Sequence, residues 1–156
     1  MNDPLVPVLT GSELCNAIVA QTPDAIVFAD RDGVIRLWNL GAEALFGFPA
    51  AEVIGRSLDV IVPERFRQAH WDAFHRAVAS GRTRPGDSVR TTRADHKSGR
   101  KLYVDLSFGL VKDASGFVLG AFAVGRDCTA RYEADRATRA RLQELEAKLA
   151  ATSGPT

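Results

Sequence analysis

The stretch that most constrains this chain runs from residue 63 to residue 78 and reads PERFRQAHWDAFHRAV. Proline is well tolerated at the first helical position, and apolar residues then recur at spacings of three and four, which predicts an amphipathic helix that stops at Gly81. His70 falls on the apolar side of this helix, whereas His75 lies about 140° away and is expected at the surface. The apolar positions are Phe66, Ala69, Ala73, Phe74, Ala77 and Val78.

An imidazole aimed into an apolar space from a rigid helix can serve two purposes. It can ligate a buried iron, or it can satisfy a buried hydrogen bond in an ordinary core. The small side chains of Ala69, Ala73 and Ala77 predict space beside the helix in which a flat macrocycle could lie. The residues alone leave both alternatives open.

Composition predicts a soluble protein with one domain. Of the 156 residues 46% are hydrophobic, and the formal net charge of +1 gives no reason to expect a nucleic-acid or membrane partner. No run of about 18 apolar residues is present, so no membrane span is expected. Cys15 and Cys128 match no zinc or redox spacing and are expected to be buried or partly buried in a reducing cytoplasm.

The order of strand and helix patterns predicts an α+β fold. The runs AIVFAD and VIRLWN flank an Asp-Gly turn and indicate a β-hairpin, and short helical pieces precede the long helix. Three strand patterns follow it, in SVRTTRADHK, KLYVDLSFGLVKD and FVLGAFAVGRD. We therefore expect a five-stranded antiparallel sheet, in the sequence order ββ-helices-βββ, with helices over one face.

Changes in composition divide the chain into four expected segments. Residues 1–10 are expected to be a flexible leader, and 11–128 a sensor domain with an N-terminal cap helix that Ser12 would cap. Residues 129–151 predict an amphipathic C-terminal linker helix of coiled-coil character, and 152–156 a disordered tail.

The two terminal helices predict a homodimer. Leu142, Leu145 and Leu149 form a stripe on the C-terminal helix that suits a two-helix seam. The apolar residues Leu14, Ile18 and Val19 of the N-terminal helix are expected to add surface to the same contact.

Two strings carry a resemblance to a known family. PDAIVFADRDGVIRLWNLGAEALFGFPAAEVIGRSL resembles the first half of a PAS domain, and GFVLGAFAVGRDCTARYEA resembles its last strand running through an Asp-x-Thr junction into a signalling helix. The resemblance spans roughly residues 13–133 and implies the PAS fold.

Within that family the chain is most similar to the haem-binding PAS domains of FixL-type oxygen-sensor histidine kinases. Their Pro-Glu-x-x-Arg-x-x-His segment reads PERFRQAH here, so the resemblance implies His70 as the axial ligand of haem b iron. An ungapped register from His70 places Arg90 where the family has a distal arginine that meets bound oxygen. The implied ligand is a diatomic gas, first O2, with CO and NO as further ligands.

The same register implies the remaining cofactor-binding residues. It places Leu106 and Phe108 in the distal pocket, and Arg76 and Arg84 where the family contacts the haem propionates. The chain departs from the family at Trp71, where the family has an acid, and the bulky Phe108 reduces the expected space.

Several other functions are weighed against haem sensing. The stretch IGRSLDVIVPERF lacks the cysteine that a flavin photo-adduct needs, and no catalytic constellation is present, so an enzyme is not expected. The alternative that stays open is a haem-free PAS interaction and dimerisation module with an empty or organic-ligand-filled pocket. In either case we expect a histidine kinase or other signalling partner, in cis or in trans; which gas and which partner stay open.

Overall fold

The computed structural model describes residues 9–83 and 89–152, and the chain begins there with a helix and a β-hairpin. Helix α1 (Gly11–Gln21) precedes strands β1 (Ala25–Asp30) and β2 (Ile35–Trp38). Five short or long helices follow: α2 (Leu40–Phe46), α3 (Ala50–Val53), η1 (Leu58–Val60), η2 (Glu64–Phe66) and α4 (Arg67–Ser80). The chain continues with β3 (Arg90–Asp95), β4 (Lys101–Lys112), β5 (Val118–Asp127) and α5 (Thr129–Thr152).

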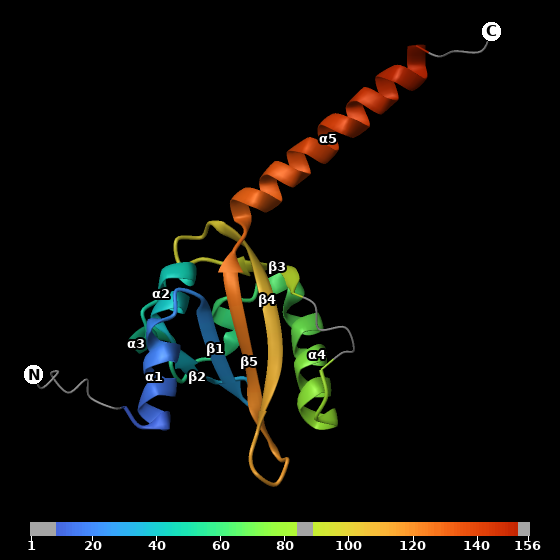
Figure 1. Cartoon of the computed structure of the whole chain (residues 1–156). Coiled ribbons are helices and arrows are strands. Elements are labelled where there is room, and N and C mark those ends of the chain that lie inside the picture. Colours follow the sequence, from blue (N-terminus) through green and yellow to red (C-terminus); the bar gives the residue numbers. More distant parts are fainter. Residues whose placement is uncertain (1–8, 84–88, 153–156) are drawn as a thin grey trace, which may run out of the picture.

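The five strands form one antiparallel sheet in the order β2-β1-β5-β4-β3. The first strand and the last therefore pair at the centre, although almost the whole domain separates them in sequence. This architecture confirms the predicted α+β fold with its ββ-helices-βββ order and its C-terminal helix (Figure 1).

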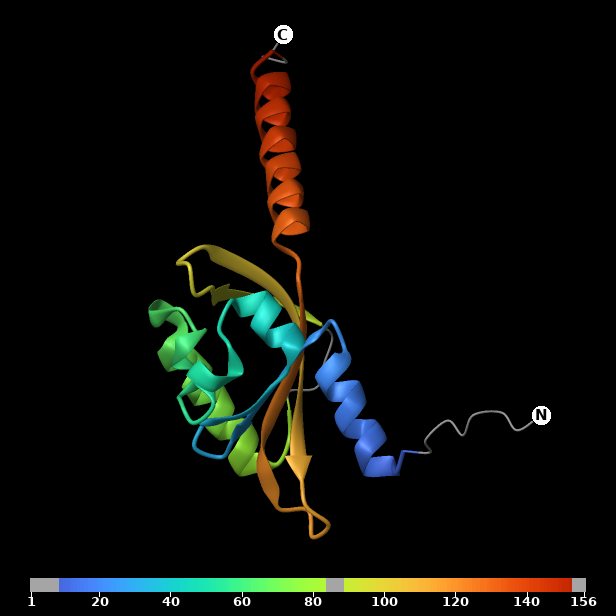
Figure 2. The ribbon, with the colours of Figure 1, turned by 90° about the vertical axis from the view of Figure 1, so that its left-hand side faces the viewer.

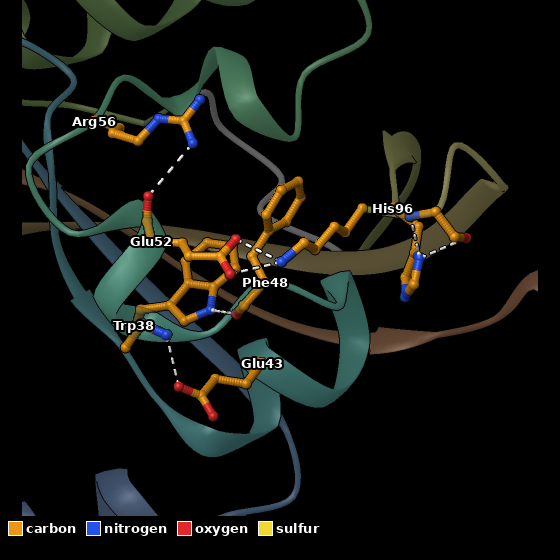
Figure 3. A network of polar contacts seen from close by, with 9 residues as sticks. Trp38, Glu43, Phe48, Glu52, Arg56 and His96 are labelled. Atoms are coloured by element: carbon orange, nitrogen blue, oxygen red, sulfur yellow. Dashed lines mark hydrogen bonds and ion pairs between the residues drawn. The ribbon is translucent and has the colours of Figure 1, made fainter.

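The main core lies between this sheet and the helices that follow β2. Fully buried side chains of β2, α2, α3 and β4 meet there, among them Ile35, Phe46, Val53, Leu102 and Val104. Polar contacts close its edge: the Trp38 indole donates to the Phe48 carbonyl at 2.9 Å, and Lys97 pairs with Glu52 at 2.6 Å (Figure 3). A second cluster joins Phe74 and Val78 of α4 to the sheet, so α4 packs on the same core side.

The two terminal helices contribute little to this core. Neither α1 nor α5 has a buried residue, and α5 projects away from the domain in both views (Figures 1 and 2). No helix within residues 9–83 and 89–152 is long and apolar enough to cross a membrane.

Three expectations about the termini need correction or lie outside the structure. Thr10, not Ser12, caps α1, because its hydroxyl accepts from the Glu13 amide while Glu13 reaches back to the Thr10 amide. Cys128 is buried, but Cys15 is exposed because its helix has no core-facing side there. Most of the expected leader and tail, residues 1–8 and 153–156, lies outside the described residues.

Candidate functional site

An apolar cavity lies between the sheet and α4, and small side chains form its floor. Ala25, Val27 and Ala29 of β1 alternate toward the helices, and β5 places Gly125, Ala123 and Ala121 directly opposite them. Strands are usually rich in bulky β-branched residues, which would fill this space. The cavity exists because these two central strands present alanines instead.

Aromatic and aliphatic side chains enclose the cavity on the other sides. The sheet adds Thr92, Arg93, Ala94, Leu106, Phe108 and Phe122. The helical side adds Phe46, Leu58, Ile61, Val62, Phe66, His70 and Phe74. The lining therefore offers one imidazole, one hydroxyl and the guanidinium of Arg93, whose buried Nε has no hydrogen-bond partner among the described residues, in a wall that is otherwise apolar.

His70 is the polar group best placed to bind a ligand in this cavity. It is partly buried on α4, with its ring centroid 6.2 Å from that of Phe74. Burial lowers the pKa of His70 below its usual value, His75 lowers it further, and the Asp59 carboxylate acts in the opposite direction. The ring is therefore neutral at neutral pH and has a lone pair available for a metal.

The hydrogen bonding of His70 is incomplete. Its Nδ1 atom is buried and has no hydrogen-bond partner among the described residues. A histidine that serves only the core would normally have its buried nitrogen paired. The ring therefore does not behave as the satisfied core histidine that the sequence left as an alternative.

The space beside α4 is not where the sequence predicted it. Ala69 and Ala73 are exposed, because they lie about 140° and 100° round the helix from Phe74, whose side chain packs on the sheet. The predicted room for a flat ligand between these alanines is wrong. The room lies instead over the alanines of β1 and β5, whose alternate spacing was the signal in the sequence.

Trp71 follows His70 and holds two contacts outside the cavity. Its Nε1 donates to Asp59 Oδ1 at 2.8 Å, and its ring lies against Gly33 in the β1–β2 turn. The His70 and Trp71 rings meet edge to face, with centroids 4.9 Å apart. Sequence reasoning recorded Trp71 only as a departure from the family.

Of the other predicted site residues, two line the cavity, two are exposed outside it, and one lies outside the described residues. Leu106 and Phe108 line the cavity, Phe108 with 45% of its surface exposed. Arg90 pairs with Leu106 across β3 and β4, but it is exposed and does not line the cavity. Arg76 is exposed on α4, and Arg84 lies outside the described residues.

The residues fit a haem in chemistry and, with one adjustment, in space. A neutral imidazole and apolar walls suit an iron macrocycle. The cavity volume is about 160 Å³, whereas sites for larger organic ligands measure about 300–1,000 Å³. Phe66 and Phe108 are 40% and 45% exposed at the edge of the cavity. A haem would need these two rings to rotate outward, and the Arg65 guanidinium, 4.5 Å from the Phe66 ring centroid, would have to move with Phe66.

Strand β4 connects this cavity to α5. The same strand that carries Leu106 carries Tyr103, whose ring stacks on Tyr132 of α5 with centroids 3.7 Å apart. The Tyr103 amide donates to Thr129 Oγ1 at 3.0 Å, and Arg131 pairs with Asp105 at 2.5 Å. The first turn of α5 is therefore attached to the strand that borders the cavity.

The chain matches one protein family, and it is similar to two proteins that are named sensors. Residues 19–133 match the family described as PAS fold. Sensor protein FixL of Bradyrhizobium diazoefficiens is 29% identical over 137 residues, 85% of this chain and 25% of that protein. Oxygen sensor protein DosP of Escherichia coli is 27% identical over 115 residues, 74% of this chain and 14% of that protein.

A solved structure shows the same fold. The PAS domain of a protein from Colwellia psychrerythraea superposes with a TM-score of 0.67 at 23% identity, covering 76% of this chain and 98% of that domain. The chain spans a quarter or less of the length of these two curated relatives.

Proposed function

The chain belongs to the PAS fold family, a family of sensory and interaction domains, and from that premise we propose that it binds haem b through His70 and senses a diatomic gas, first of all O2. The observation that carries the proposal is the neutral His70 imidazole in a largely apolar cavity. The relatives support it: one is named an oxygen sensor, and the other a sensor protein.

Each residue has a defined part in this proposal. Haem iron supplies an open coordination position for the gas. His70 would hold the iron from α4, and Leu106 and Phe108 would shape the opposite wall. The Arg90 side chain has no hydrogen bond or ion pair within residues 9–83 and 89–152, and it would have to turn inward from its exposed position to donate toward a gas ligand. Arg76 and Arg84 are assigned to the propionates by the resemblance alone.

The signal would leave the domain through α5. Movement of the cavity wall on β4 shifts Tyr103 and Asp105, which hold Tyr132 and Arg131 of that helix. The exposed stripe of Leu142, Leu145 and Leu149 provides a surface for a second copy, and a histidine kinase or similar signalling protein would receive the signal.

The test is a visible spectrum of the full chain expressed with haem supplied. We expect wild type to bind one haem per chain and His70→Ala to lose affinity by at least about 10-fold, because the axial bond is lost. His96→Ala is the control, since this histidine lies in the β3–β4 turn and does not line the cavity. A colourless wild type, or equal haem retention in His70→Ala, would refute the proposal.

The cavity size also favours a second candidate, a small aromatic organic ligand. A cavity of about 150 Å³ lined by apolar side chains can hold benzene, and this one measures about 160 Å³. Native mass spectrometry of protein purified under haem-replete conditions distinguishes the two: a bound mass well below that of haem supports the haem-free module.

A further inference from the structure

The imidazole of His70 lacks the support that histidine ligands usually have. Such a ligand normally donates its second ring N–H to a carboxylate or a backbone carbonyl, which fixes the orientation of the ring. Here Nδ1 has no such partner among the described residues. The ring orientation therefore depends on packing, and the aromatic neighbours of His70 are Trp71 and Phe74, at centroid distances of 4.9 Å and 6.2 Å.

Trp71 is itself held firmly from two directions. Its indole N–H donates to Asp59 Oδ1 at 2.8 Å. On the other side its ring sits on Gly33, so closely that a Cβ at that position would lie 2.2 Å from the ring atoms. An aromatic ring with a fixed polar end and a fixed face can act as a rigid support for a neighbour.

Asp59 also contacts a second residue of α4, Arg67, in addition to Trp71. Arg67, one turn before His70 and Trp71, donates to the Asp59 carbonyl at 3.1 Å and to the Val62 carbonyl at 3.2 Å. The segment η1, which carries Asp59, is capped by the Ser57 hydroxyl. The carboxylate thus lies on an ordered turn and is joined to residues on both sides of His70.

We infer that Trp71, held by Asp59 and Gly33, is a positioning residue that orients the His70 ring in place of the missing hydrogen bond. The inference rests on the proposed role of His70, but the orientation itself is a property of the ligand-free chain. Trp71 does not line the cavity and touches no ligand there. Its effect is transmitted through the edge-to-face contact of the two rings.

The decisive variant is Trp71→Phe, which keeps an aromatic ring beside His70 but removes the indole N–H and the outer ring atoms that lie against Gly33. In the ligand-free full chain, we expect nuclear Overhauser contacts between the His70 and Phe74 rings to weaken because His70 samples several orientations. In the haem-loaded chain, we expect haem loss to become about 10-fold faster, and the iron–imidazole stretching band in the resonance Raman spectrum to broaden.

Trp38→Phe is the matched control. Trp38 loses an equivalent hydrogen bond, to the Phe48 carbonyl at 2.9 Å, in a network on the α2–α3 side of the core (Figure 3). We expect its stability to fall while the His70 contacts and the haem-loss rate stay as in wild type. Equal disturbance of His70 in both variants would overturn the inference, because the effect would then be general loosening.

Asp59 provides an independent route if Trp71→Phe folds poorly. Asp59→Ala removes the acceptor and should reproduce the Trp71→Phe effects, whereas Asp59→Asn keeps an acceptor oxygen and should retain the His70 contacts. Loss of the Arg67–Asp59 ion pair matters little, since both side chains are about 40% exposed. If Trp71→Phe and Asp59→Ala both keep the His70–Phe74 ring contacts of the wild-type chain, the inference is rejected. If the wild-type chain binds no haem, only the proposed function is rejected.

Discussion

Gly33 links a turn of the sheet to the helix that carries His70. Its φ of +75° lies in the left-handed region, and the Trp71 ring occupies the volume that a side chain would need. Gly99 has a similar φ of +82°, but open space surrounds the position of its missing Cβ. Both glycines therefore need a positive φ, but only Gly33 has a side chain, that of Trp71, packed against it.

This difference gives a prediction for stability. Gly33→Ala and Gly99→Ala should each lose about 1–2 kcal/mol because alanine is strained at positive φ. Gly33→Ala should lose roughly 1–3 kcal/mol more, because its methyl group overpacks against Trp71. The free energy of unfolding in urea, measured for both variants, gives the backbone cost from Gly99→Ala and the additional packing cost from the difference between the two. Equal losses would show that Trp71 moves away at no cost and does not support the neighbouring His70 ring.

The central strands and α4 show how far pattern reasoning extends. Strand patterns between turn signals predicted all five strands, with clear alternation in the fourth, and a helical period predicted α4 and the inward side of His70. The same period did not distinguish alanines that face the core from alanines beside it, because small residues are tolerated in both places. Only the packing of Phe74 and Val78 on the sheet decides that Ala73 points outward.

Arg90 shows a second reason for incomplete prediction. The ungapped alignment from His70 implied that Arg90 meets bound oxygen, whereas in the structure Arg90 pairs with Leu106 on β4 but is exposed and does not line the cavity. Whether a residue at the end of an edge strand is covered depends on the chain around it, which strand periodicity does not describe. The hydrogen bond from Trp71 to Asp59 was not predicted either, because twelve residues separate them and no local motif joins them.

The floor of the cavity can be tested by filling it. Ala123 lies between Val27 and Phe108 in the sheet and faces the cavity. Ala123→Leu should stabilise the ligand-free chain by about 0.5–2 kcal/mol, as cavity-filling changes commonly do, and should prevent haem uptake because the side chain occupies its space.

Ala73→Leu makes the same change on the exposed side of α4. It should alter stability by no more than about 0.5 kcal/mol and leave haem uptake unchanged. Thermal unfolding and the visible spectrum measure both properties. Haem uptake at the wild-type level in Ala123→Leu would place the ligand away from β5.

The assembled domain leaves two apolar surfaces uncovered, one on each terminal helix. Leu14 and Ile18 of α1 are 49% and 58% exposed, and the leucine stripe of α5 is about as open. A helix that extends from its domain with no buried residue gains little from tertiary packing and is stabilised when its apolar stripe pairs with another helix. The sequence predicted this stripe from heptad spacing, and the structure leaves its partner as a prediction.

The last prediction concerns self-association through that stripe. We expect the full chain at about 50 µM to have twice the monomer mass in light scattering. Leu145→Glu places a charge at the centre of the stripe, so two copies would bring like charges together in an apolar seam, and this variant should be monomeric. Ala147→Glu adds the same charge about 200° round α5 from Leu145 and should remain dimeric. A monomeric wild type would exclude the homodimer, and dimers of equal stability in both variants would place the contact elsewhere than on α5.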